Sequence, residues 1–236
     1  MFLVIDAGNT RIKYGCHDGE RWLLQCVLED GRFRFPEGFS PRRVVMSCVA
    51  GQKVKDFLLR TVAELGASSE WLSASVERCG LQCGYDDPSS LGPDRWAAAL
   101  GAWCLTGRSC VVMSAGTATT IDLIRAPGIY DGGCILPGLS MMQDALARGT
   151  AMLTFAEGEI ALPARNTHDA IHTGCVLAQV GALREVSRML SPDAPIILTG
   201  GAAPSLLSLL GSAVQYRPWL TLEGMLSVAR DGARDA

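Results

Sequence analysis

The sequence predicts an α/β protein built from two related halves. Short apolar runs typical of buried strands alternate with amphipathic segments, and the opening stretch "MFLVIDAGNTRIKYG" has a counterpart, "VVMSAGTATTID", near the middle of the chain. Aligning the two places Gly8 on Gly116, about half of the 236 residues further on. Such internal similarity indicates a repeated unit. We expect two domains, residues 1–106 and 107–236, with the boundary near 104–110.

The first half is expected to begin as a β-meander. Its first apolar run ends at Asp6, and after a small-residue turn the alternation from Ile12 to Cys16 has the two-residue period of a strand. A later amphipathic segment is apolar on one helical face and ends at Gly66. In order, we expect strands at 3–5, 12–16, 22–28 and 43–49, a helix at 52–65, a loop at 85–93 and a helix at 94–105.

The second half restarts the same theme. An apolar strand leads into the turn Ser114-Ala115-Gly116-Thr117 and then into a β-rich run that contains Asp122. Later, Thr199-Gly200-Gly201 separates an apolar strand from a helix. In order, we expect strands at 110–113 and 119–124, helices at 139–146 and 167–190, a strand at 194–198, and helices at 204–210 and 219–229.

Composition limits the classes of function. The formal net charge is −3 and the pI about 5.6, with no basic stripe, which argues against a nucleic-acid partner. No apolar run is long enough for a secretion signal or a membrane span. The nine cysteines are scattered, and the pair Cys79 and Cys83 lacks the second pair that a zinc site needs. We therefore expect a cytoplasmic protein in a reducing compartment.

The stretch from Asp6 to Lys13 is a candidate phosphate loop. Small residues let backbone amides approach phosphate oxygens, and Asn9 and Thr10 add side-chain donors. Because a carboxylate repels phosphate, Asp6 suggests a Mg²⁺ ion as mediator. The alternative is an ordinary hairpin with an aspartate at its strand end. The second copy favours the phosphate loop, since two such turns facing each other would grip a nucleotide from both sides.

The stretch "YDDPSSLGPDRW" allows two interpretations. Asp94 could simply cap the helix that follows, because aspartate is a favoured N-cap. Alternatively, Asp94 is a general base and Arg95 binds a substrate carboxylate.

The stretch "RNTHDAIHTG" is expected to start a helix capped by Asn166 or Thr167. His168 and His172 are four residues apart on one helical face, but the glutamate of zinc proteases is missing beside the first. Two ordinary surface histidines explain this pattern better than a metal site.

Taken together, the motifs resemble those of the type III pantothenate kinases, members of the actin/hexokinase/Hsp70-like ATPase superfamily. The resemblance covers about five-sixths of the chain. It rests on "DAGNT" at 6–10, "LGPDRW" at 91–96, "AGTATTID" at 115–122, "GGCILPG" at 132–138, "RNTHDAI" at 165–171 and "LTGG" at 198–201.

The resemblance implies two ribonuclease-H-like/actin-like domains with a nucleotide cleft between them, and ATP-dependent phosphorylation of pantothenate in the first step of coenzyme A biosynthesis. It implies Asp94 as the proton acceptor, Mg²⁺ near Asp6, and a homodimer in which Thr167 contacts pantothenate across the interface. The implied ATP contacts are Asp6, Ala7, Gly8, Asn9, Thr10, Arg11, Ile12, Lys13 and Thr117, and the implied pantothenate contacts are Tyr85, Gly92, Pro93, Asp94, Arg95 and Thr167.

One position departs from the family pattern. The family commonly has aspartate in the second turn as a ligand of K⁺ or NH₄⁺, and this chain has Ser114. A neutral hydroxyl is a poorer cation ligand, so we expect weak or absent K⁺ activation. Two other functions stay open at this point: a kinase of the same superfamily for another small hydroxyl substrate, and a non-catalytic accessory factor that affects transcription.

Overall fold

The computed structural model describes residues 1–149 and 158–232. By internal packing these residues form two compact units. Unit 1 contains residues 1–108, 124–131 and the C-terminal segment from 219, and unit 2 contains residues 109–123 and 132–218. The chain therefore leaves unit 1 and returns to it twice. Each unit is built around a mixed β-sheet with helices packed against it.

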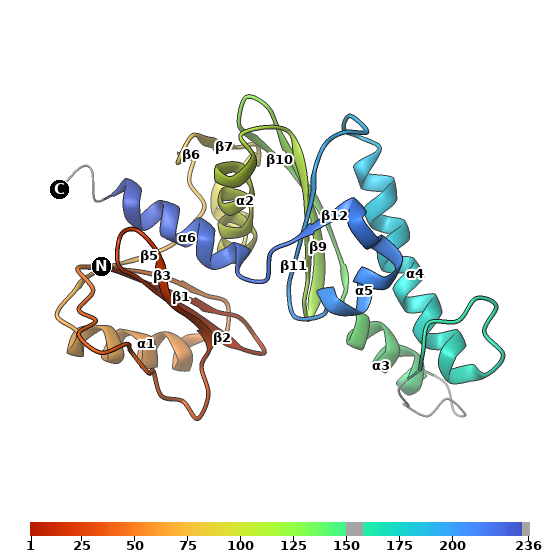
Figure 1. Cartoon of the computed structure of the whole chain (residues 1–236), viewed down its shortest axis with the longest axis horizontal. Coiled ribbons are helices and arrows are strands. Elements are labelled where there is room, and N and C mark those ends of the chain that lie inside the picture. The colour runs from red at the N-terminus through yellow and green to blue at the C-terminus, as the bar shows by residue number, and fades with distance from the viewer. Residues whose placement is uncertain (150–157, 233–236) are drawn as a thin grey trace. The chain divides into compact units, whose positions relative to one another are not determined.

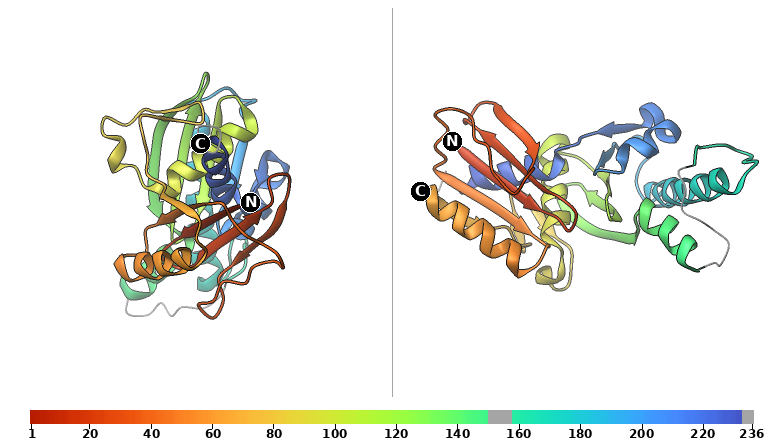
Figure 2. Two further views of the ribbon diagram at one scale, coloured as in Figure 1. Left: turned by 90° about the vertical axis from the view of Figure 1, so that its left-hand side faces the viewer. Right: turned by 90° about the horizontal axis from the view of Figure 1, so that it is seen from below.

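Unit 1 has a five-stranded sheet in the order β3-β2-β1-β4-β5. β1 is antiparallel to β2 and parallel to β4, so a hairpin and a crossover meet at the first strand. The next crossover, from β4 to the parallel strand β5, contains α1, which packs against one face of the sheet (Figure 1; Figure 2, right). Leu58 and Val62 of α1 belong to the apolar core on that face. The elements are β1 Phe2–Ala7, β2 Ile12–His17, β3 Trp22–Val27, β4 Arg43–Cys48, α1 Gln52–Glu64 and β5 Ser68–Trp71.

Two helices, α2 (Pro93–Thr106) and α6 (Leu220–Asp231), pack closely on each other within unit 1, and α6 lies against β1 and β4 (Figure 1). Glycines make the helix crossing possible. A Cβ on Gly224 would lie 1.9 Å from the carbonyl oxygen of Ala97, and a Cβ on Gly101 would lie 2.5 Å from that of Leu220. The C-terminal helix is therefore part of the unit that contains the N-terminus.

Unit 2 repeats the strand order of unit 1, because its strands run β10-β9-β8-β11-β12. β8 is parallel to β11, as β1 is to β4. Val176, Val180 and Leu183 of α4 pack into the core of this unit. The elements are β8 Cys110–Ala115, β9 Ala118–Arg125, β10 Ile129–Pro137, α3 Leu139–Gly149, α4 Thr167–Ser187, β11 Ile196–Thr199, α5 Ala203–Leu210 and β12 Val214–Tyr216.

The remaining elements are short. β6 (Glu77–Arg78) and β7 (Leu81–Cys83) form a small hairpin, and β7 pairs with Ile129 and Tyr130 at the start of β10. Single turns of 3₁₀ helix follow at Pro88–Ser90 and Gly211–Ala213.

The α/β class, the initial β-meander and the predicted helices are confirmed. The repeated strand order supports two related halves. The predicted boundary between residues 106 and 107 marks where the second repeat begins, and it stays a prediction. β5, β6, β7, β10 and β12 were not among the predicted strands, because they are short, exposed or rich in glycine.

Candidate active site

Asp6 lies near the end of β1, at the middle of the unit 1 sheet. Its backbone is paired with Lys13 of β2 on one side and with Ser47 of β4 on the other. Only 9% of the residue is exposed, and Oδ1 has no hydrogen-bond partner among residues 1–149 and 158–232. A buried, unpartnered carboxylate oxygen is costly and is typical of a functional position.

The environment of Asp6 favours its neutral form. Burial, and after it the neighbouring Asp94 carboxylate, raise the pKa of Asp6 from 3.8 to about 6. Lys13 and Ser47 act on the same pKa in the opposite direction. The pKa of Lys13 is in turn lowered by burial, and its Nζ lies 5.8 Å from the ring centroid of Trp219. Unit 1 thus brings Asp6, Asp94 and Lys13 into one electrostatic cluster.

The predicted phosphate loop is a strand–turn–strand segment. Ala7 and Ile12 are the last paired residues of the two strands, and the amide of Gly8 donates to the carbonyl oxygen of Arg11 over 3.1 Å. The three residues at the tip are exposed: Asn9, Thr10 and Arg11. The tip therefore presents amides and polar side chains to solvent beside a buried carboxylate.

Asp94 lies in the first turn of α2, which begins at Pro93. The alternative interpretation, in which Asp94 caps the helix, is wrong, because the N-cap is Gly92 and proline occupies the first helical position. Asp94 Oδ1 accepts a hydrogen bond from the amide of Arg95 over 2.9 Å. A Cβ on Gly92 would lie 2.8 Å from this carboxylate oxygen, so glycine is needed for the loop to pass this close.

Arg95 is buried against two tyrosines. Its Nη1 donates to the hydroxyl of Tyr85 over 2.9 Å, and its guanidinium carbon lies 5.9 Å from the ring centroid of Tyr85 and 6.0 Å from that of Tyr130. Trp96 packs edge-on against Tyr130. These contacts therefore hold the positively charged guanidinium of Arg95 in a fixed position, on the residue that follows Asp94.

In unit 2, backbone turns pack against one another around the end of β8. The amide of Gly138 donates to the carbonyl oxygen of Thr117 over 3.0 Å, and the amide of Ala202 donates to that of Ala115 over 3.0 Å. A Cβ on Gly138 would lie 2.1 Å from the carbonyl oxygen of Gly116. The second turn therefore presents exposed Thr117 on a rigid, small-residue frame.

Ser114 occupies in unit 2 the place that Asp6 has in unit 1. It pairs across parallel strands with Thr199, whose Oγ1 is buried and has no hydrogen-bond partner within the described ranges. Two hydroxyls replace the carboxylate and hydroxyl of the first half. This donor set does not fit a cation site that depends on a carboxylate ligand.

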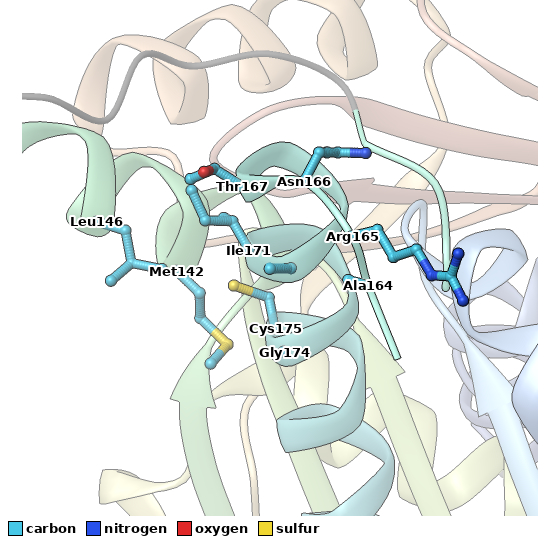
Figure 3. A pocket seen from close by; sticks show the side chains of 10 residues that line it. Met142, Leu146, Ala164, Arg165, Asn166, Thr167, Ile171, Gly174 and Cys175 are labelled. Atoms are coloured by element: carbon cyan, nitrogen blue, oxygen red, sulfur yellow. The ribbon is translucent and has the colours of Figure 1, made fainter. Parts of the chain in front are cut away.

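Thr167 lies in a separate part of unit 2. It is the first residue of α4, and Asn166 is the N-cap, accepting from the amide of Asp169 over 2.9 Å. Thr167 lines a pocket of about 720 Å³ between α3 and α4 (Figure 3). The apolar residues Met142, Leu146 and Ile171 form much of the wall.

One histidine of α4, His172, contacts Gln143 of α3. His172 Nδ1 is 3.0 Å from Nε2 of Gln143, and within residues 1–149 and 158–232 no group of three or more histidine, cysteine or acidic side chains could hold a metal ion. None of the described helices is both long and apolar enough to cross a membrane.

Comparison with protein families gives a match to the type III pantothenate kinase model over residues 2–189. The chain belongs to the type III pantothenate kinase family. It is 44% identical to the type III pantothenate kinase of Aromatoleum aromaticum, with 99% of each chain covered, and 40% identical to that of an Azoarcus species, with 100% of this chain and 93% of the relative covered. The protein is thus a kinase that phosphorylates pantothenate in the first step of coenzyme A biosynthesis.

Solved structures show the fold of this kinase. A Baf family protein of Campylobacter jejuni has a TM-score of 0.67 at 21% identity, covering 98% of this chain and 99% of its own. The activator of the Clostridium difficile 2-hydroxyisocaproyl-CoA dehydratase has a TM-score of 0.55 at 10% identity, covering 100% and 97%. The kinase therefore shares the fold of these proteins, and its two mixed β-sheets with helices packed against them agree with the predicted α/β class.

Three residues near the predicted site were missed by the sequence analysis: Ser47, Tyr130 and Trp219. Tyr130 and Trp219 belong to no predicted motif and reach unit 1 only because the chain returns there twice. Ser47 carries a usable signal. It is a polar residue near the end of an otherwise apolar strand, as Asp6 is.

Proposed function

We propose that Asp94 is the general base of this pantothenate kinase. The pantothenate hydroxyl oxygen attacks the γ-phosphorus of ATP, the bond to the ADP oxygen breaks, and the hydroxyl proton passes to the Asp94 carboxylate. Because the transition state of phosphoryl transfer is loose, positioning and charge neutralisation supply most of the catalysis. The observation that carries this proposal is the electrostatic interaction of Asp94 with Asp6 in unit 1.

The residues around Asp6 fit a Mg²⁺ ion, which would neutralise phosphate charge when bound. Magnesium prefers oxygen ligands and is held by one or two carboxylates together with substrate phosphates. Asp6 offers an unpartnered, buried Oδ1, and repulsion from Asp94 adds to the need for a cation. We assign Asp6 to the metal, directly or through a bound water, and residues 6–13 with Thr117 to ATP.

Arg95 and Tyr85 are proposed to bind the pantothenate carboxylate and the adjoining part of the substrate. A guanidinium held against two aromatic rings loses little conformational freedom when it binds an anion. The contacts of Arg95 with Tyr85 and Tyr130 support this assignment. Gly92 and Pro93 shape the backbone beside it. Measuring ADP release with a panel of hydroxy acids and sugars as substrates tests whether the enzyme accepts only pantothenate.

A homodimer is the proposed assembly, with Thr167 completing the pantothenate site of the partner subunit. The pocket beside Thr167 supports this, because its apolar wall includes Leu146, a side chain that is 40% exposed. Sedimentation velocity of the wild type and of Leu146→Glu tests the dimer. A monomeric wild type at micromolar concentration would contradict it. The buried cysteines Cys16, Cys48 and Cys175 are free thiols, which supports a cytoplasmic location.

Asp94→Asn tests the proposed base. We expect kcat to fall by roughly 10²–10⁴, the range for loss of a general base, with ATP affinity retained. The measurement is pantothenate-dependent ADP release together with equilibrium ATP binding. Asp56→Asn makes the same chemical change on the exposed surface of α1 and should leave both unchanged. Turnover of Asp94→Asn close to wild type would remove Asp94 from this role.

A further inference from the structure

The side-chain hydroxyl of Ser47 is buried but makes no hydrogen bond that would stabilise the fold in the part of the chain that the structure describes. The residue is 0% exposed on β4, between β1 and β5, and Oγ has no hydrogen-bond partner among the described residues. Serine hydroxyls in strands ordinarily bond a nearby carbonyl or are replaced by apolar groups, because an unsatisfied buried hydroxyl costs about 1–3 kcal/mol. A buried polar atom of this kind requires an explanation.

The neighbour of Ser47 is Asp6. The two residues are register partners on parallel strands, so their side chains leave the sheet on the same face. The opposite face, with Val44, Met46 and Cys48, packs into the apolar core beneath α1. Ser47 favours the charged form of Asp6, although neither Ser47 Oγ nor Asp6 Oδ1 completes a hydrogen bond within the described residues. Two unsatisfied oxygens therefore lie side by side.

Unit 2 provides an internal comparison. The equivalent strand positions hold Ser114 and Thr199, and Thr199 Oγ1 is also buried without a partner in the part of the chain that the structure describes. The hydroxyl near the end of the fourth strand is therefore present in both halves, whereas only the first half places a carboxylate beside it. A threonine is also compatible with this place in the fold.

We propose that Ser47 is a positioning residue for Asp6: when a divalent cation binds, the Ser47 hydroxyl donates to the carboxylate and orients it towards the cation. The inference rests on the proposed function, in which Asp6 is the carboxylate nearest the metal. A hydrogen bond to one carboxylate oxygen restricts rotation of the whole carboxylate, so the other oxygen keeps one orientation. Groups that orient metal ligands in this way usually contribute about 10- to 100-fold to metal affinity or activity.

The test uses Mn²⁺ as the probe, with ADP present and the full-length protein. Electron paramagnetic resonance of unbound Mn²⁺ gives its dissociation constant without turnover. We expect Ser47→Ala to weaken Mn²⁺ binding by about 10- to 100-fold. Ser47→Thr, which restores the hydroxyl found at the equivalent position of unit 2, should recover most of the affinity. Ser47→Cys, with a weaker donor, should behave like Ser47→Ala and serves if that variant folds poorly.

Val45→Ala is the matched control. Val45 is fully buried two residues earlier on the same strand and the same face, so its truncation weakens packing without removing a donor. We expect a lower melting temperature and unchanged Mn²⁺ affinity.

Asp6→Asn separates this inference from the proposed function. If Asp6→Asn loses Mn²⁺ while Ser47→Ala binds it within twofold of wild type, the role of Ser47 is wrong and the metal assignment stands. If Asp6→Asn also keeps wild-type affinity, the metal assignment is wrong, and the inference falls with it.

Discussion

In the first half of the chain, the parallel strands β1 and β4 place Asp6 beside Ser47, whereas in the second half β8 and β11 place Ser114 beside Thr199. The strand order around these pairs is the same in both units. One half therefore offers a buried charge at this position, and the other offers two neutral hydroxyls. Two halves with the same strand order can therefore differ in charge at the strand end that leads into each turn.

The largest expected consequence of this asymmetry is a stability cost at Asp6. Burial, reinforced by Asp94, raises the pKa of Asp6 to about 6 in the folded protein, against 3.8 as the ordinary value. Between these values the folded protein binds more protons than the unfolded chain, so the free energy of unfolding falls as pH rises through this window. Above pH 6 the decrease in the free energy of unfolding is complete and amounts to roughly 3 kcal/mol.

Asp6→Asn should remove this pH dependence in metal-free protein. We expect the variant to be more stable than wild type at pH 8 and to show a smaller slope between pH 4 and 6 (about the unfolded and folded pKa values of the wild type). Urea unfolding in EDTA at several pH values measures both. Ser114→Asn, the same residue at the equivalent position of unit 2, should leave the slope as it is. An unchanged slope in Asp6→Asn would mean that Asp6 is not the group that titrates.

A second comparison concerns the helices that follow the last strand of each half, α2 and α6. They cross at two glycines, where added methyl groups would overlap backbone. Gly224→Ala should destabilise the protein by about 1–3 kcal/mol, the usual cost of overpacking, and Gly101→Ala should destabilise it by somewhat less. Thermal melts followed by circular dichroism measure the difference.

Gly181 provides the control for these glycines. It lies within α4, and a Cβ there meets nothing within 4 Å, so Gly181→Ala should stabilise by about 0.5–1 kcal/mol. A Gly224→Ala variant as stable as wild type would show that the helices can separate without cost.

Much of the fold could be predicted because the signals were local. Period-two alternation identified β2, and one apolar face with a terminal glycine identified α1. The return of α6 to unit 1 could not be predicted, since it depends on the close approach of Gly224 and Ala97, more than a hundred residues apart. For the same reason the motifs identified Asp94 and Arg95, whereas Tyr130, which lies beneath Arg95 only after folding, was missed.

The smallest expected effect concerns monovalent cations and tests the asymmetry directly. The pair Ser114 and Thr199 has no carboxylate, and hydroxyl oxygens alone compensate little for the lost hydration of K⁺. We therefore expect the wild-type rate of ADP release to be nearly the same in Na⁺ and in K⁺ buffers.

Ser114→Asp should restore a carboxylate beside Thr199 and create a K⁺-dependent increase in rate of a few-fold, with no such increase in Na⁺. At this half-buried position beside a hydroxyl, the new charge is best satisfied when a cation is bound, which links the stability of the variant to K⁺ concentration. Melting temperatures in the two salts measure that linkage independently of turnover. A steep rise of the wild-type rate on adding K⁺ would show instead that the two hydroxyls suffice, and that the halves differ less in function than in charge.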